Sequence, residues 1–459
     1  MNICINPQHF TGTVRIPASK SHTIRQLLIA SLADGTSEIL YPLDSLDTRS
    51  CISACRAFGA QIYEHYDGEK LAKLTVKGNA NFFVRAENLL PSLPTPHSPL
   101  PTIDVGNSGT TLYLALALAA LQKSPIQFTG DEQIQKRSAA PLLEALAGVG
   151  VKCQSNNGCA PITVQGPWTG GKVRLPCPTS QYLSAMLIAA PLAPQGTVTE
   201  IEVPLLNEKP YIEMTLSYLK KQGIPFEADF SGRFVVHGGY SYKPFVSSVP
   251  ADFSSAAFPA AAAAITGGPV TLLGLDPQDT QGDKFFLEML KEMGCDLTFG
   301  EAGSQTISRK GALTGGSFDL NETPDLLPAA AAVAAYANGD TSLVNVAHAR
   351  IKETDRIAVM AKELAKLGVK CTEKPDGLVI HGKGVSHQEK YTINSQDNNK
   401  STLLPTPYSP LPILNGHGDH RVVMALAVAA LGGSYPIEIT DAEAANVTYP
   451  GFLSLFTVF

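Results

Sequence analysis

One apolar, Ala-rich stretch recurs along the whole chain, and this repeat restricts the fold more than any other feature of the sequence. Each copy carries few charges and is typical of a helix that is buried on most sides. Successive copies begin 71 to 96 residues apart, around a basic period of roughly 72. The copies are RQLLIASLADG from Arg25, TTLYLALALAAL from Thr110, QYLSAMLIAAPLA from Gln181, SSAAFPAAAAAITGG from Ser254, DLLPAAAAVAAYANGD from Asp325 and RVVMALAVAALGG from Arg421.

Two nearly identical Pro-rich insertions account for the two longest intervals. Residues 93–101 read LPTPHSPLP and residues 404–412 read LPTPYSPLP, and they precede the second and the sixth copies. Segments so rich in proline are typical of surface loops and not of a packed core. Their matching positions predict two loops at the rim of the molecule, to which the sequence assigns no role.

A second recurring element follows the apolar stretch in most units, as an amphipathic helix that ends near a glycine. TLSYLKKQGIPFE from Thr215 and MAKELAKLGVKC from Met360 are two examples, and their charged faces favour a position on the outside. Glycine just beyond a helix is the expected C-cap, and Val-rich runs such as RFVVHGG close the units as strands. Each unit therefore reads β-α-β-α-β-β, which predicts an α/β protein of two domains with three units each.

Composition and charge narrow the class of protein further. A length of 459 residues favours two or more domains, and a net charge of −6 disfavours non-specific binding to nucleic acid. The N-terminus lacks a secretory pattern, and the apolar run at residues 111–121 is too short to span a bilayer. The eight Cys form no CxxC pair. We therefore expect a cytoplasmic protein with reduced thiols and with neither a nucleic-acid nor a membrane partner.

Basic residues stand at the starts of several apolar helices, where a cation opposes the helix dipole. These starts are rich in Ser, Thr, Asn, Gly and Asp, which cap helices without any ligand. Lys20, Arg25 and Arg421 go beyond capping, because a helix N-terminus attracts anions and a cation there needs one to balance it. The sequence thus indicates an anionic ligand.

Further charged residues extend this candidate site. Arg137 ends the segment TGDEQIQKR, and Lys352 and Arg356 share a face if the segment ARIKETDRI is helical. Collected in one cleft, the six cations would hold a ligand with several phosphate or carboxylate groups, which match the fork of an Arg side chain. Asp325 and Glu353 are the candidates for an acid/base pair beside them.

Seven motifs, in order along nearly the whole chain, resemble the 5-enolpyruvylshikimate-3-phosphate (EPSP) synthase family of enolpyruvyl transferases. They are SKSxxxR at 19–25, GNSGT at 106–110, TSQYLSAML at 179–187, KPY at 209–211, Pro324-Asp325, KETDR at 352–356 and DHR at 419–421. The resemblance implies two inverse α/β barrel-like domains of three β-α-β-α-β-β units each. The first domain would span residues 20–245, the second residues 1–19 plus 246–459, and the active site would lie in the cleft between them.

The activity that the resemblance implies is transfer of the carboxyvinyl group of phosphoenolpyruvate (PEP) to the 5-hydroxyl of shikimate 3-phosphate, as a 3-phosphoshikimate 1-carboxyvinyltransferase. The hydroxyl adds to C2 of the enol while C3 is protonated, and the intermediate then loses phosphate and a C3 proton. The reaction belongs to the shikimate pathway of aromatic amino-acid biosynthesis. No metal and no cofactor are implied, a monomer is expected, and glyphosate would occupy the PEP site.

Residue roles follow from the matching positions. Asp325 would accept the proton of the 5-hydroxyl, Glu353 would protonate the methylene carbon, and Lys20 would touch both substrates. The resemblance implies shikimate 3-phosphate contacts for Lys20, Ser21, Arg25, Thr179, Ser180, Gln181, Asp325 and Lys352, with Tyr211 as a weaker member. It implies PEP contacts for Lys20, Gly109, Arg137, Gln181, Arg356 and Arg421, and supporting positions for Asp47, Arg49, Asp355 and His420.

Four positions depart from the family pattern. Tyr113 stands where an Arg usually follows GNSGT, and Val447 replaces a Lys that usually contacts PEP. Glu208 replaces the Ser before KPY, whereas Thr179 keeps the hydroxyl of the usual Ser. Losing the partner of a buried charge costs roughly 2–5 kcal/mol, so we expect weak PEP binding for this family.

Three other interpretations are open at this stage. The departures favour a non-catalytic family member that binds shikimate 3-phosphate, which an assay of phosphate release would distinguish from an enzyme. The sister enzyme that acts on UDP-N-acetylglucosamine usually carries a reactive Cys on a loop of the first domain, and residues 129–137 contain none. The HxDH sequence at 417–420 has the residue types of a metal site, but the DHR motif already accounts for Asp419, His420 and Arg421, and no metal is expected.

Overall fold

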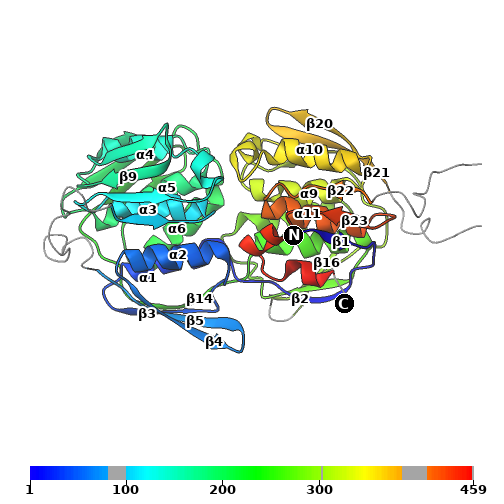
Figure 1. Ribbon diagram of the computed structural model, residues 1–459, viewed down its shortest axis with the longest axis horizontal. Coiled ribbons are helices and arrows are strands. Elements are labelled where there is room, and N and C mark those ends of the chain that lie inside the picture. The colour runs from blue at the N-terminus through cyan, green and yellow to red at the C-terminus, as the bar shows by residue number, and fades with distance from the viewer. Residues whose placement is uncertain (81–99, 301–302, 385–410, 457–459) are drawn as a thin grey trace, which may run out of the picture. The chain divides into compact units, whose positions relative to one another are not determined.

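The computed structural model of the chain describes residues 1–80, 100–300, 303–384 and 411–456. Most of both Pro-rich insertions, residues 93–99 and 404–410, lies outside the described residues. The chain forms two compact units (Figure 1). The Lys20 unit comprises Pro17–Asp252 and Gln278–Gly282, and the Asp325 unit comprises Met1–Ile16, Phe253–Pro277 and Asp283–Phe459.

Each unit encloses three apolar helices, which confirms the predicted burial of the repeated stretches. Every residue of α3, α7, α9 and α11 is buried. In the Asp325 unit α7, α9 and α11 pack on one another, and in the Lys20 unit α3 packs against α1 and α5. The bounds are α1 Lys20–Ser31, α3 Gly109–Ala119, α5 Ser180–Ala189, α7 Phe253–Thr266, α9 Leu327–Ala334 and α11 His420–Leu431.

Five amphipathic helices accompany the apolar ones and bury one face each. Figure 1 shows α1 and α2 side by side against one face of a sheet, an arrangement that their contacts with strands β3, β4 and β5 confirm. The amphipathic helices are α2 Leu46–Ala57, α4 Ala140–Gly148, α6 Lys209–Lys221, α8 Phe285–Glu292 and α10 Arg356–Lys366. Short 3-10 helices are η2 Ile134–Lys136, η3 Ala190–Leu192, η4 Gly282–Lys284, η6 Pro324–Leu326, η7 Ala347–Ile351, η9 Ala442–Val447 and η10 Phe452–Leu455.

The predicted glycine caps are confirmed at all five amphipathic helices. A glycine lies two residues beyond the last helical residue each time, with φ between 71° and 103°. Only glycine adopts this left-handed conformation without a steric penalty, so it ends the helix and turns the chain into the following strand. The five are Gly59, Gly150, Gly223, Gly294 and Gly368.

Three four-stranded sheets of one pattern form the Lys20 unit in its described residues, in the orders β14-β3-β5-β4, β6-β7-β9-β8 and β10-β11-β13-β12. In each, the first two strands pair in parallel and the others antiparallel, as a β-α-β unit followed by a hairpin requires. The strands are β3 Thr36–Leu40, β4 Gln61–Asp67, β5 Lys70–Lys77, β6 Thr102–Asp104, β7 Ile126–Thr129, β8 Lys152–Asn156, β9 Cys159–Gln165, β10 Gly171–Arg174, β11 Val198–Glu202, β12 Phe226–Asp229, β13 Arg233–His237 and β14 Val246–Ser248.

The described part of the Asp325 unit has two sheets of this pattern, β16-β17-β15-β2 and β18-β19-β21-β20, and a three-stranded sheet, β1-β23-β22. The last differs from the predicted repeat, because the N-terminal strand β1 pairs antiparallel with β23 in place of a following hairpin. The strands are β1 Ile3–Ile5, β2 Gly12–Arg15, β15 Val270–Leu273, β16 Asp296–Phe299, β17 Gln305–Ser308, β18 Ser317–Asp319, β19 Asn338–Val344, β20 Lys370–Lys374, β21 Gly377–Lys383, β22 Ile413–Leu414 and β23 Ile437–Ile439.

Strands β2 and β14 are exchanged between repeats. β2 precedes α1 along the chain but pairs in parallel with β15, and β14 precedes α7 but pairs in parallel with β3. Each strand therefore completes a sheet whose other strands lie elsewhere in the sequence. As a result, the chain passes between the units directly before α1 and α7, close to Lys20 and Ser254.

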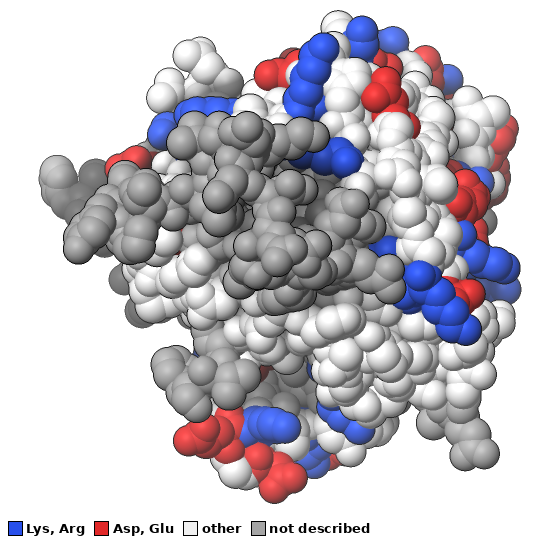
Figure 2. Space-filling view, turned by 90° about the vertical axis from the view of Figure 1, so that its right-hand side faces the viewer, with Lys and Arg blue, Asp and Glu red and all other residues white. Residues whose placement is uncertain are grey.

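The surface that Figure 2 shows carries basic and acidic side chains in small neighbouring groups, with uncharged surface between them. Because charges of opposite sign lie next to one another, their electrostatic fields largely cancel at a distance from this surface. Among the described residues, no helix is both long and apolar enough to cross a bilayer.

Candidate active site

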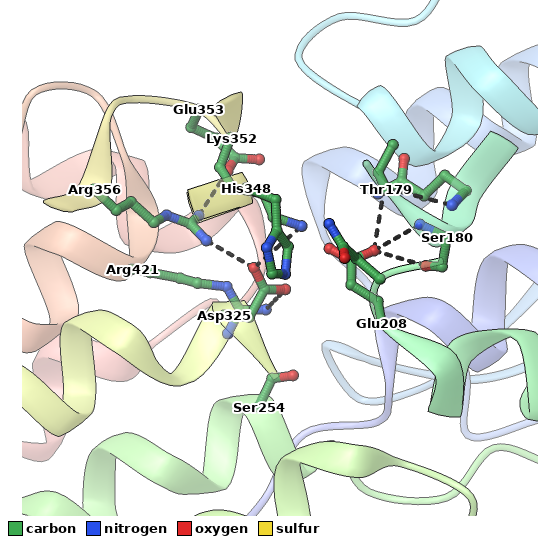
Figure 3. Close-up of polar contacts among 12 residues, drawn as sticks. Thr179, Ser180, Glu208, Ser254, Asp325, His348, Lys352, Glu353, Arg356 and Arg421 are labelled. Atoms are coloured by element: carbon green, nitrogen blue, oxygen red, sulfur yellow. Dashed lines mark hydrogen bonds and ion pairs between the residues drawn. The ribbon is translucent and has the colours of Figure 1, made fainter. Parts of the chain in front are cut away.

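Arg356 lies at the centre of a group of buried charges in the Asp325 unit (Figure 3). Its guanidinium donates to Asp325 Oδ1 at 2.7 Å and to Glu353 Oε2 at 2.6 Å. It also donates to both oxygens of Asp419, at 2.8 and 3.1 Å. Burial lowers the pKa of Arg356, but the three carboxylates outweigh this effect and hold the pKa above its ordinary value. The cation is therefore a fixed part of the structure.

Asp325 in η6 is shared by three cations. Its Oδ1 accepts from Arg356 and lies 4.0 Å from Lys352 Nζ, and its Oδ2 lies 3.0 Å from Arg421 Nη2. Burial alone would raise the pKa of this carboxyl, but Arg421, Lys352 and Arg356 hold it far below the usual range. Asp325 is thus ionised at neutral pH and faces a positively charged wall.

The prediction that Lys352 and Arg356 share a helix face is wrong. The 3-10 helix η7 ends at Ile351, and α10 begins only at Arg356. Asp355 explains the interruption, because its side chain accepts from the backbone N–H of Ala358 at 3.0 Å and caps the new helix. The two cations lie near each other through their common partner Asp325.

Asp419 is a fully buried partner of Arg356, and the sequence analysis did not predict this pairing. It caps α11 by accepting from the backbone N–H of Arg421 at 2.9 Å, and it accepts from Thr354 Oγ1 at 3.1 Å. An Asp directly before an apolar helix is a readable cap signal. Its ion pair with a residue 63 positions away is not readable from the sequence.

Lys20, the first residue of α1, forms an ion pair with Asp47 in the first turn of α2, at 2.9 Å. Asp47 is buried, whereas Lys20 and its neighbour Ser21 are partly exposed. Asp47 therefore holds the ammonium group in place, in agreement with its expected supporting position.

Arg25 is buried further along α1, where the protein itself satisfies its guanidinium. It donates to Thr215 Oγ1 at 2.9 Å, to Ser184 Oγ at 3.1 Å, and to the backbone carbonyls of Ser21 and Tyr211 at 3.2 and 3.3 Å. Burial lowers its pKa to about 10. A ligand anion at this place would meet a preorganised cation on α1.

Thr179 and Ser180 form the start of α5, and the carboxylate of Glu208 fills it (Figure 3). Glu208 Oε2 accepts from the Ser180 backbone N–H at 2.9 Å, from Ser180 Oγ at 2.7 Å and from Thr179 Oγ1 at 3.2 Å. Next to them, Gln181 Oε1 is buried and has no hydrogen-bond partner among the described residues. This helix start thus binds an anion, and in this structure the anion belongs to the protein.

Gly109 begins α3 beside the guanidinium of Arg137. A Cβ at position 109 would lie 2.7 Å from Arg137 Nη1, so glycine allows the close approach. Tyr113, which stands where the family has an Arg, is buried, packs edge-on against Tyr182 at 5.0 Å and donates to the Ser138 carbonyl at 3.4 Å. The Tyr113 side chain therefore packs α3 against its neighbours.

The remaining candidates lie in other surroundings. Arg49 donates to Asp44 at 2.6 Å, in a partly exposed ion network on α2, and Val447 is partly buried in η9. His417 Nε2 lies 3.0 Å from Glu363 Oε1, so it does not share a partner with Asp419. Within the described ranges no group of three His, Cys, Asp or Glu side chains could hold a metal ion.

The predicted residues divide into two groups, one in each unit, and ion pairs join the members of the Asp325 group. The Asp325 group consists of Asp325, Lys352, Glu353, Arg356 and Arg421. The Lys20 group, spread over the starts of α1, α3, α5 and the residues beside them, consists of Lys20, Ser21, Arg25, Gly109, Arg137, Thr179, Ser180 and Gln181.

Comparison with known proteins gives one consistent result. Residues 5–456 match the family model described as EPSP synthase (3-phosphoshikimate 1-carboxyvinyltransferase). Proteins of that name from Ruminiclostridium cellulolyticum and Acetivibrio thermocellus are 41% and 42% identical, over 99% and 97% of this chain and 97% and 95% of theirs. The EPSP synthase structure from Acinetobacter baumannii is similar with a TM-score of 0.75 and 28% identity, covering 99% of this chain and 97% of that one.

Proposed function

This chain belongs to the family of EPSP synthases (3-phosphoshikimate 1-carboxyvinyltransferases), and we propose that the Asp325 group and the Lys20 group both take part in its reaction. The enzyme transfers the carboxyvinyl group of PEP to shikimate 3-phosphate in the biosynthesis of aromatic amino acids. The observation that supports the site most strongly is the Asp325 carboxylate between Arg356, Arg421 and Lys352. A carboxylate held between cations is typical of a site that handles protons beside anionic ligands.

Proton transfer would divide between two carboxyl groups of the Asp325 unit. Asp325 would accept the proton of the 5-hydroxyl as its oxygen attacks C2 of PEP, and Lys352 would orient that hydroxyl. Glu353 would supply the proton to C3 and take one back when phosphate leaves, and the departing phosphate would take up the proton held by Asp325, so neither carboxyl group gains a net proton. Glu353 is held by Arg356 at 2.6 Å, which fixes its position for both steps.

Substrate binding would adjust the basicity of Asp325. In the ligand-free site Arg421, Lys352 and Arg356 hold the pKa of Asp325 far below its usual range, which makes it a weak base. The phosphate and carboxylate of PEP would draw Arg421 toward themselves, and the pKa of Asp325 would then rise. The base would gain strength only when PEP is in place.

The Lys20 group would hold the acceptor. Arg25 offers a buried guanidinium, and Thr179 and Ser180 offer two hydroxyls and a backbone N–H at a helix N-terminus, which suit a phosphate. The buried Gln181 Oε1 supports a ligand with a donor group such as a ring hydroxyl. Lys20, Gly109 and Arg137 would contribute the contacts to PEP.

A direct test measures phosphate release by the purified protein with shikimate 3-phosphate and PEP. We expect turnover that requires both substrates and falls at least about 100-fold in Lys20→Met and in Glu353→Gln, since each removes a group that acts on the reacting atoms. Binding of shikimate 3-phosphate without any turnover would contradict the proposal and favour a non-catalytic binding protein.

Gly109→Ala tests the PEP contact of Arg137. The new methyl group would lie 2.7 Å from Arg137 Nη1, and the flexible guanidinium can move away at little cost in stability. We therefore expect the KM for PEP to rise about tenfold, as loss of one charge contact predicts. Gly311→Ala is the control, because nothing lies within 4 Å of its Cβ position. An unchanged KM for PEP in Gly109→Ala would contradict the assigned contact.

We also infer a cytoplasmic, monomeric enzyme. The eight cysteines are all free thiols, which supports a reducing compartment. The proposed roles are complete within one chain, which supports a monomer.

A further inference from the structure

We propose that Glu208 is an internal competitor of the substrate phosphate: its carboxylate fills the start of α5 in the ligand-free protein, and shikimate 3-phosphate must displace it. This inference rests on the proposed function, in which Thr179 and Ser180 bind that phosphate. It concerns a residue at which this chain departs from the family pattern, which usually has a Ser before KPY.

The geometry at the start of α5 is that of an occupied anion site. Three donors, the Ser180 N–H, Ser180 Oγ and Thr179 Oγ1, converge on the single oxygen Oε2 of Glu208 at 2.7 to 3.2 Å. Glu208 is buried. A phosphate oxygen prefers the same set of donors at the same distances. Glu208 Oε2 therefore occupies the position that the proposed function assigns to a phosphate oxygen of shikimate 3-phosphate.

The backbone of Glu208 supports a specific placement of this carboxylate. The residue directly precedes α6 with φ 58° and ψ 41°, a left-handed conformation that residues other than glycine seldom adopt. Such a conformation persists only where surrounding contacts hold it. The three hydrogen bonds to the start of α5 are contacts of this kind.

A nearby buried cation explains why a carboxylate is tolerated here. Burial lowers the pKa of the Arg25 guanidinium, and Tyr218, Tyr211 and Glu208 partly oppose this effect through their charges. Without an anion beside them, Arg25 and the α5 N-terminus would carry uncompensated positive charge. Glu208 supplies the missing anion until the substrate arrives.

A substrate phosphate and the Glu208 carboxylate cannot use these donors together. Both are anions, and the donors already bind Oε2 at full hydrogen-bond distance. The apparent association constant for the phosphorylated substrate therefore equals the intrinsic constant multiplied by the fraction of molecules in which the carboxylate has moved away. Unphosphorylated shikimate does not need the α5 start, so its affinity does not depend on Glu208.

The test is isothermal titration calorimetry of shikimate 3-phosphate and of shikimate on the wild type, Glu208→Ala, Glu208→Gln and a control. In Glu208→Ala we expect shikimate 3-phosphate to bind about tenfold more tightly, which corresponds to a carboxylate in place in nine of ten molecules. Glu208→Gln should lie between, because its amide keeps an acceptor but loses the charge. Glu213→Gln removes a partly exposed carboxylate from α6, the helix that Glu208 precedes, and should match the wild type.

Kinetics give a second measurement. The KM for shikimate 3-phosphate should fall in Glu208→Ala by the same factor, while kcat stays within about twofold, because Glu208 touches no reacting atom in the proposed site. A merely structural role would lower kcat or stability and leave this KM unchanged or raised.

The outcomes separate this inference from the proposed function. Equal or weaker binding of shikimate 3-phosphate by both Glu208 variants, relative to the wild type, overturns the inference and leaves the proposed site intact. A complex with shikimate 3-phosphate in which Glu208 Oε2 still accepts from Ser180 overturns it as well. Failure of the wild type and of every variant to bind shikimate 3-phosphate overturns both.

Discussion

Asp325→Asn is expected to lower kcat by about 10²- to 10⁴-fold, the usual contribution of a general base. The amide has the same shape but cannot take the proton of the 5-hydroxyl. PEP affinity should not weaken, because the substitution removes an anion that competes for Arg421 and Arg356. Steady-state kinetics with both substrates, together with PEP titration, measure the two effects separately.

Asp340→Asn is the matched control for this prediction. Asp340 lies in the same unit on strand β19 and pairs with His381 at 2.8 Å on the surface. Its loss should leave kcat and both KM values unchanged. An Asp325→Asn enzyme that keeps more than about a tenth of the wild-type kcat would show that another group takes the proton.

Arg356→Met is expected to destabilise the folded protein by about 3–5 kcal/mol, as removal of one partner from a buried ion pair usually does. The variant leaves Asp419 and the carboxylates of Asp325 and Glu353 without their shared cation. Arg356 and Asp419 are both fully buried, so water cannot replace the lost contacts. Urea unfolding followed by circular dichroism measures the change.

A control and a double variant identify the cause of this destabilisation. Arg350→Met removes a guanidinium whose carboxylate partners, Asp355 and Glu373, are exposed, and about 1 kcal/mol is expected. Arg356→Met combined with Asp419→Leu should lose less than the sum of the two single variants, because neither charge is then left alone. Strict additivity would mean that the pair is not coupled.

The fold could be predicted from the sequence where short-range signals decide it. Apolar stretches with few charges became the enclosed helices, and the glycines at 59, 150, 223, 294 and 368 became the caps that end the amphipathic ones. These outcomes depend on side-chain polarity and on the conformational freedom of single residues, which act within a few positions. The exchange of β2 and β14, and the use of β1 in the last sheet, depend on pairing between distant segments. Local sequence patterns do not predict which distant strands pair.

The same distinction holds for the candidate site. The basic residues at the helix starts, such as Lys20 and Arg421, indicated an anionic ligand by themselves, because a cation at a helix N-terminus needs an anion to balance it. Which charges neutralise each other was decided only by the tertiary structure: Arg356 binds Asp419 across 63 positions, and Glu208 binds the start of α5 across 28. Burial makes these partners obligatory, since a charge removed from water must find a counter-charge wherever the fold supplies one.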